Sequence, residues 1–371
     1  TVRIQKHFHV EDRASLSLLS DMFEQLLYRQ TLRLEHFNLL GAAALGEILI
    51  EQETIPALGH SYADGTCGTC GAADPDYVSP LFDIDVARMT LAYSYLNKGE
   101  YEKALAQIQD LLANTTATVL PKEDVLTNGF NNVDSENWIW GQDVTIENTS
   151  ALASFFGQVD IYSYSYASAG DVKGIDANLL AEIDANIWDV RRGWWGNYYA
   201  QNNEASYEYA PDGKFFSAKS KELMGDRNWL SDNVFMRIET AYLIAAEAAF
   251  RKKTPDYALA LQYLSQLTDE RVKEGMQLEY ALYKQQLAAD NTALEKAIKY
   301  NWRVEMWGEG YGFPNFRRWG EAVTLGKNQF RKDQTITPET PIMFTFVIPT
   351  SETNYNPYIR QTTELAQKPR K

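Results

Sequence analysis

The strongest constraint on the fold is a spacing of small and large side chains that predicts paired antiparallel helices. Between residues 83 and 113, two alanines stand where neighbouring helices would approach closely and a glycine stands where the chain would turn. Larger side chains stand where they would fill the groove between the helices; the whole set is Ala92, Ala104, Gly99, Leu91, Tyr95, Tyr101 and Ile108. Because glycine reverses a chain at low steric cost, the pattern predicts a helical hairpin.

A second segment repeats this pattern from Arg237 to Leu267, with small and large residues at Ala246, Ala249, Tyr257, Ala260 and Leu264. The offsets of both segments resemble those of tetratricopeptide hairpins. A plain solenoid needs at least three stacked units, and only two separated hairpins are visible. We therefore expect a mainly α-helical scaffold that carries large insertions.

The main insertion is expected over residues 116–230, where the helical period of the apolar residues is lost. Its composition is rich in Thr, Asn, Gly and aromatic residues, which is typical of irregular structure with short strands. Tyr162, Tyr164 and Tyr166 alternate with serines, a period that would place all three rings on one face of a strand. Such a strand would either pack its tyrosines on a helix or expose them as a platform for a ligand.

Composition excludes some classes of function. Fifty acidic against 35 basic residues give a net charge of −15. Nucleic-acid binding needs a basic surface, so we expect no nucleic-acid partner. The chain has no apolar run long enough to span a membrane. Its 13% of aromatic residues exceeds ordinary core needs and favours a surface that meets ligands.

The two cysteines, Cys67 and Cys70, form an isolated CxxC flanked by Gly, Asp and Pro. No second ligand pair follows at zinc spacing, and the flanks do not suit a redox motif. The sequence favours a small loop disulfide or two thiols. We expect no cofactor or catalytic metal, although Asp-rich loops leave room for a structural calcium ion.

The segment 292–320 combines a helix with a turn rich in glycine. Thr292 and Glu295 are spaced as a capping box at the start of the helix. Apolar residues then recur every four positions and predict one buried stripe: Leu294, Ile298, Trp302 and Met306. We expect Trp302, Met306 and Trp319 to be largely buried.

Glu305 and Glu309 lie four residues apart, which raises the question of a catalytic acid pair. Glycosidase carboxylates must flank the scissile bond, whereas these two would stack along one helix face. The sequence favours a structural ion network, with neutralising charges expected from Arg303, Arg317 and Arg318.

The same segment resembles the C-terminal signature of the SusD/RagB family. Positions that match the signature are Arg303, Glu305, Trp307, Glu309, Gly310, Phe313, Phe316, Arg318, Trp319 and Gly320. Two further family motifs stand in the right order. The first matches at Met236, Arg237, Glu239, Tyr242, Leu243, Ala246, Glu247 and Ala248, and the second at Ile348, Pro349, Glu352, Asn356 and Pro357. Gly312 and Pro314–Asn315 depart from the family pattern.

The resemblance implies a structural role, not a ligand-binding one, for the signature residues Arg237, Glu239, Glu247, Arg303, Glu305, Glu309, Arg318 and Trp319. It also implies one SusD-like unit over 1–371. That unit would comprise an N-terminal helical part (1–115), a ligand-binding insertion (116–230) and a C-terminal part (231–371).

The function that the resemblance implies is nutrient binding without catalysis. Family members bind oligosaccharides, sometimes peptides, at the surface of Gram-negative bacteria and deliver them to a SusC-like TonB-dependent outer-membrane transporter. They are outer-membrane lipoproteins, so an anchor is expected by kinship, although its cysteine is not among these residues. Two alternatives follow from the residues: a tetratricopeptide-type protein-interaction scaffold and an α-helical glycoside hydrolase.

We expect the ligand to dock on the insertion. The candidate residues are Tyr162, Tyr164, Tyr166, Trp194, Trp195, Asn197, Tyr198 and Tyr199. Adjacent side chains alternate faces in an extended chain, so at least one of the two tryptophans should face outward. The alternative is that these rings seal the insertion against the helical body. The site would then be the loop 53–80, around Tyr62 and Tyr77.

Overall fold

The computed structural model describes part of the 371-residue chain, namely residues 62–63, 66–67, 83–127, 130–199, 206–216, 230–330, 332–337 and 349–355. Its contacts divide the chain into one unit of residues 4–91 and a larger unit of 1–3 with 92–371. The smaller unit contains strands β1 (Tyr62–Ala63) and β2 (Thr66–Cys67), which pair antiparallel, and the first residues of helix α3. The sequence-based division at 115 and 230 stays a prediction.

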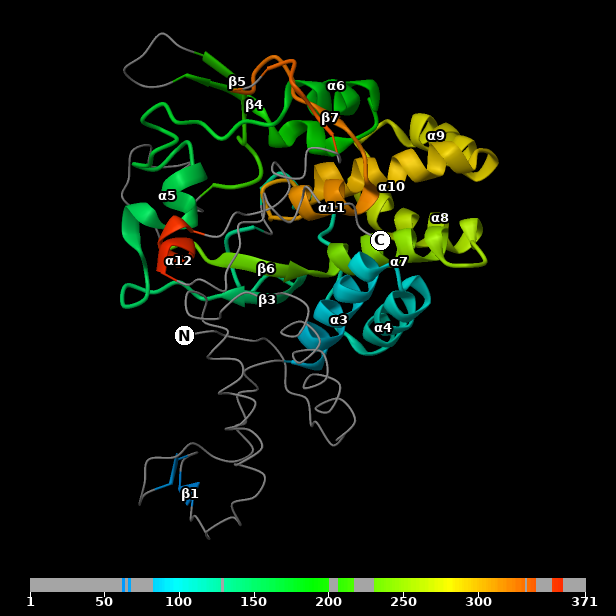
Figure 1. Cartoon of the computed structure of the whole chain (residues 1–371), viewed down its shortest axis with the longest axis horizontal. Helices are drawn as coiled ribbons and strands as arrows, with labels where there is room; N and C mark the ends of the chain where they lie inside the picture. The colour runs from blue at the N-terminus through cyan, green and yellow to red at the C-terminus, as the bar shows by residue number, and fades with distance from the viewer. Residues whose placement is uncertain are drawn as a thin grey trace. The chain divides into compact units, whose positions relative to one another are not determined.

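Helices dominate the described residues, so the predicted mainly α fold is confirmed (Figure 1). The α-helices are α3 (Ile84–Lys98), α4 (Tyr101–Asn114), α5 (Phe155–Val159), α6 (Ala177–Ala185), α7 (Ile238–Arg251), α8 (Tyr257–Thr268), α9 (Gln277–Ala289), α10 (Asn291–Glu305), α11 (Gly312–Trp319) and α12 (Thr350–Tyr355). Short 3₁₀ helices are η2 (Ala151–Ala153), η3 (Val190–Trp194) and η4 (Asp269–Arg271).

The strands of the larger unit are short and paired two by two among the described residues. They are β3 (Trp138–Gln142) with β6 (Asn233–Arg237), β4 (Gly196–Tyr199) with β5 (Ser206–Ala210), and β7 (Val323–Thr324) with β8 (Thr335–Ile336), each pair antiparallel. Strand β6 runs directly into α7, so the β3–β6 pair joins the insertion to the helical scaffold.

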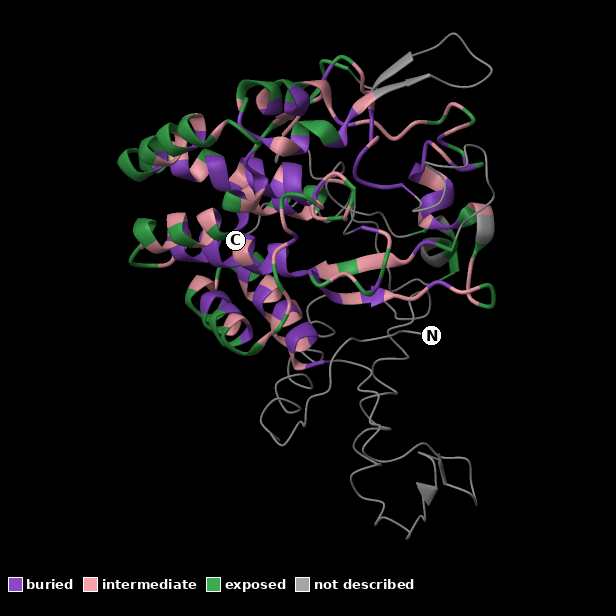
Figure 2. Ribbon diagram, turned by 180° about the vertical axis from the view of Figure 1, so that it is seen from behind, coloured by how far each residue is buried: buried purple, intermediate pink, exposed green. Residues whose placement is uncertain are grey.

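The two predicted hairpins are present. Gly99 turns the chain between α3 and α4 with φ +76°, in the left-handed region that glycine adopts readily. Ala92 and Ala104 are fully buried, as their small size requires. In the second hairpin α7 packs against α8, and α4 and α10 also pack on α7. Figure 2 shows the burial concentrated along these central helices.

Helix α10 carries the predicted apolar stripe, because Leu294, Ile298, Trp302 and Met306 are all buried. Its predicted start is wrong. The helix begins one residue before Thr292, and the Asp290 carboxylate caps it by accepting a hydrogen bond from the Thr292 N–H at 2.8 Å. Asp is a stronger N-cap than Thr, which explains why Asp290 and not Thr292 caps the helix.

Trp319, also expected to be largely buried, is partly exposed at the end of α11 and less buried than Trp302 and Met306. Its indole N–H donates to Glu247 at 3.0 Å.

No helix in the described part of the chain is both long enough and apolar enough to cross a membrane.

Candidate functional site

The signature encloses a buried network of charges. Its cations are Arg191, Lys214, Arg237 and Arg271, and its anions are Asp189, Glu239, Glu305 and Glu309. Each of these side chains is at most 7% exposed. The four positive and four negative charges balance, which is what buried ions require to offset their lost hydration.

Glu305 is the centre of the network. Its carboxylate accepts hydrogen bonds from Arg191 Nη1 at 3.0 Å, Arg237 Nη1 at 3.1 Å and Arg271 Nη2 at 2.9 Å. Burial alone would raise the pKa of this carboxyl, but Arg271 and Arg237 hold it well below its usual range. Glu305 is therefore ionised at neutral pH.

Lys214 connects the insertion to the signature turn. Its ammonium donates to the backbone carbonyls of Glu305 (2.6 Å) and Trp307 (2.8 Å) and to Glu309 Oε1 (2.8 Å). Burial lowers the pKa of Lys214 to about 8, even though Glu309 favours the charged form. Arg237 donates to the other Glu309 oxygen at 2.8 Å, and the pKa of Glu309 lies below its usual value despite burial.

The predicted neutralising partners of Glu305 and Glu309 are wrong. Arg303 instead pairs with Glu182 at 2.7 Å, Arg318 pairs with Glu247, and Arg317 is exposed. Arg303 lies two residues before Glu305 on α10, and helical residues two apart point to nearly opposite sides.

The real cationic partners come from η3, the segment after β5, β6 and η4, which lie far from α10 in sequence. Sequence reasoning missed Asp189, Arg191, Lys214 and Arg271. The one local signal was Lys214, a charge followed directly by two phenylalanines.

The buried charge network predicts that the folded state loses stability at low pH. The folded-state pKa values of Glu305 and Glu309 lie below the ordinary value of 4.5. Their contribution is therefore fully present above that pH and is lost as pH falls toward the folded-state values. We expect Tm to hold between pH 7 and about 5 and to fall steeply below about pH 4. A Tm unchanged down to pH 3 would contradict the assignment.

Trp194 and Trp195 are both buried, with 0% and 2% of each residue exposed. The expectation that one of them faces outward is wrong. Trp194 is the last residue of the 3₁₀ helix η3 and Trp195 follows it in extended backbone, so the two do not lie in one extended strand and their side chains need not alternate faces. The Trp194 indole donates to the carbonyl of Val125 at 2.6 Å, and the two rings pack edge to face. Neither ring is accessible to a ligand.

The three predicted tyrosines lie in a loop of turns, residues 160–171, which we call the tyrosine loop; the predicted strand is wrong. Serine hydroxyls bonded to nearby backbone favour such turns over a strand, as with Ser165 Oγ, which donates to the Asp160 carbonyl. The loop is also held by backbone hydrogen bonds from Tyr166 N–H to Gly157 and from Asp171 N–H to Tyr166, both 2.9 Å.

The tyrosine loop presents two of its rings to solvent. Tyr164 and Tyr166 are 50% and 47% exposed. Tyr162 is half-buried, and its hydroxyl donates to Asp212. The loop therefore places two exposed aromatic side chains on a hydrogen-bonded backbone.

For several of the predicted residues, the structure does not describe the side chain. Asn197, Tyr198 and Tyr199 are described only as backbone in β4, and Tyr62 and Cys67 only as backbone in β1 and β2. Tyr77, Cys70 and most of the last family motif lie outside the described residues. Within those residues, no group of three or more His, Cys, Asp or Glu side chains could hold a metal ion.

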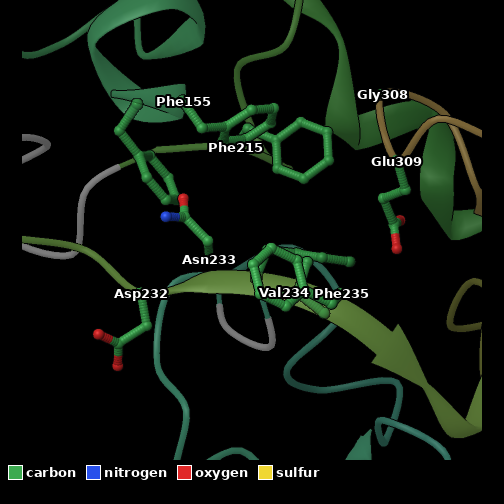
Figure 3. Close-up of a pocket in the computed structure, with 10 residues that line it drawn as sticks. Phe155, Phe215, Asp232, Asn233, Val234, Phe235, Gly308 and Glu309 are labelled. Carbon is green, nitrogen blue, oxygen red and sulfur yellow. The ribbon is translucent and has the colours of Figure 1, made fainter. Parts of the chain in front are cut away.

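A cavity of about 290 Å³ opens between β6, α5 and the turn after α10 (Figure 3). Its lining comprises Phe130, Phe155, Phe156, Phe215, Asp232, Asn233, Val234, Phe235, Gly308 and Glu309. Gly308 has φ +79°, and a Cβ there would lie 2.5 Å from the Phe215 ring. Sequence reasoning placed no ligand near Gly308 and Glu309, yet both line this space.

Comparison with known proteins supplies the context for this site. The model of the SusD family matches residues 117–364. A SusD superfamily protein from Bacteroides thetaiotaomicron is 22% identical, with a TM-score of 0.62 over 76% of this chain and 60% of the other. A SusD-like carbohydrate binding protein from Bacteroides vulgatus is 18% identical, with a TM-score of 0.52 over 86% and 64%.

A SusD superfamily protein from Bacteroides vulgatus is 17% identical, with a TM-score of 0.57 over 75% of this chain and 58% of the other. The chain thus spans about three fifths of the length of these solved structures. No curated protein matches it.

Proposed function

The chain belongs to the SusD family, and from this premise we propose that it binds oligosaccharides at the cell surface without transforming them. The proposal includes delivery of the bound glycan to a SusC-like TonB-dependent transporter in the outer membrane of a Gram-negative bacterium. Family membership supports the delivery step, the location and a lipid anchor. One structural neighbour is itself described as carbohydrate binding.

The observation that carries the proposal is the pair of exposed rings in the tyrosine loop. A sugar ring presents C–H groups on its faces and hydroxyls at its edge, so it pairs with a flat aromatic face that carries a polar tip. Tyr164 and Tyr166 supply such faces. Because backbone hydrogen bonds already order the loop, little conformational entropy is lost when a glycan binds.

The electrostatics of the signature support binding without hydrolysis. A glycosidase needs a general acid whose pKa is raised so that it stays protonated near neutral pH. Glu305 and Glu309 have lowered pKa values and are paired with buried cations. Neither carboxylate suits the role of proton donor.

The test is calorimetry of the purified protein against a panel of oligosaccharides, followed by the Tyr164→Ala, Tyr166→Ala double variant. We expect affinity for the bound glycan to fall by tenfold or more, ~1.4 kcal/mol, with an unchanged Tm, since both side chains are half exposed. Chromatography of the glycan after prolonged incubation should return it intact.

The matched control is Tyr355→Ala on α12, which removes a tyrosine that is 88% exposed outside the loop and should leave affinity unchanged. Equal affinity in the double variant and the parent would move the site away from the tyrosine loop. Cleaved glycan would make the protein a hydrolase.

A further inference from the structure

The cavity described above has a composition unlike that of the tyrosine loop. Its walls include five phenylalanines, Phe130, Phe155, Phe156, Phe215 and Phe235. Its volume of about 290 Å³ lies near the lower end of small-molecule sites, roughly 300–1,000 Å³. A space of this size accommodates one substituted sugar ring and not a long chain.

The polar groups of the cavity are few, and most are already paired. Glu309 accepts from Lys214 and Arg237, and Asp232 accepts from the N–H groups of Val133 and Val144, each at 2.8 Å. Figure 3 shows the Asp232 carboxylate directed away from Phe155 and Phe215. Neither carboxylate is therefore an open partner for a ligand.

Asn233 is different. Its Nδ2 donates to Gln142 Oε1 at 3.1 Å, but its Oδ1 is buried and accepts no hydrogen bond from any residue in the described part of the chain. Figure 3 shows this amide rising from β6 toward Phe155. A buried acceptor without a donor costs free energy, which a ligand that supplies the donor would recover.

A ligand that suits this cavity carries one hydrogen-bond donor next to an apolar group. An acetamido substituent has both, an N–H and a methyl group. Resting on the proposed function, we propose that the cavity binds the acetamido group of an N-acetylated sugar residue. Its N–H donates to Asn233 Oδ1, which a rotation of the amide brings to the cavity surface, and its methyl group lies among Phe155, Phe215 and Phe235. A hydroxyl in that place could also donate to Asn233, but it carries no methyl group for the phenyl walls and would bury less apolar surface.

The test compares two trisaccharides by calorimetry. Chitotriose, used here in its N,N′,N″-triacetylated form, and cellotriose share a β-1,4-linked backbone and differ only in carrying an acetamido group or a hydroxyl at C2. We expect chitotriose to bind at least tenfold more tightly. Asn233→Ala should abolish most of this preference, and Phe235→Ala should weaken it without unfolding the protein, because Phe235 is 45% exposed. Tm is measured for each variant, and Asn114→Ala, an exposed site on α4, is the matched control.

Equal or tighter binding of cellotriose overturns the acetamido proposal while leaving glycan binding intact. The proposal also fails if the parent prefers chitotriose and a folded Asn233→Ala variant keeps that preference, since the recognition then lies elsewhere. If neither trisaccharide binds, the acetamido site is refuted, and the glycan panel with the tyrosine variants still decides the proposed function.

Discussion

Replacing Glu305 by glutamine is expected to lower the free energy of unfolding by about 3–5 kcal/mol, because the change leaves the four cations of the buried network with three carboxylates and one uncompensated positive charge. Glu305 contacts Arg191, Arg237 and Arg271, all of which are fully buried, and no other carboxylate of the network contacts all three. Glutamine keeps the size of the side chain, so the loss measures charge and hydrogen bonding, not a cavity. Urea unfolding followed by tryptophan fluorescence gives the free energy.

The matched control for this variant is Glu182→Gln. Glu182 pairs with Arg303, but its side chain is 44% exposed, so the loss should stay below ~1 kcal/mol. If Glu305→Gln cost no more than Glu182→Gln, the buried network would not be what stabilises the signature. If the variant fails to accumulate as folded protein, the fraction recovered from the soluble extract, compared with that of Glu182→Gln, measures the same effect.

Trp302→Ala is expected to destabilise the fold by about 3–5 kcal/mol, the usual range for truncating a buried large aromatic side chain. Trp302 is 1% exposed, and its ring lies 5.6 Å from that of Tyr311 and 6.2 Å from that of Tyr93. Truncation would leave a cavity between α10 and these two rings. The change in the denaturant midpoint measures the loss.

Phe330→Ala is the control for Trp302→Ala, because Phe330 is 99% exposed and its removal should change stability by less than ~0.5 kcal/mol. Ligand affinity separates the two roles that an aromatic residue of the signature could have. A Trp302→Ala variant with the parental midpoint but without glycan binding would make the signature a binding site and would reverse our interpretation.

The buried stripe of α10 could be predicted from the sequence because its determinants are local. Four apolar residues at a spacing of four lie on one face whatever the rest of the chain does. The same holds for the turn at Gly99, since the preference for positive φ is a property of that residue. Family motifs added the helix-rich scaffold, which the structure confirms.

The candidate site was harder to predict, because its local sequence patterns are compatible with more than one backbone conformation. Alternating tyrosines suit a strand, yet serine-to-backbone hydrogen bonds turn the chain at residues 160–171. Adjacent tryptophans face opposite ways only where both lie in extended backbone, and Trp194 ends the 3₁₀ helix η3. Local periodicity therefore predicted the wrong backbone for Tyr162, Tyr164 and Tyr166, of which the last two are exposed, and misplaced Trp194 and Trp195.

By itself the sequence determined the helical scaffold, the apolar stripe and the family, because each depends on residue spacings that are local to individual segments. Only the tertiary structure decided which cations neutralise Glu305 and where a cavity forms. Lys214 meets Glu309 across 95 positions and Arg191 meets Glu305 across 114. The cavity at Asn233 likewise needs α5, β6 and the turn at Gly308 together. Contacts over such separations depend on how the elements pack, and no single segment encodes that packing.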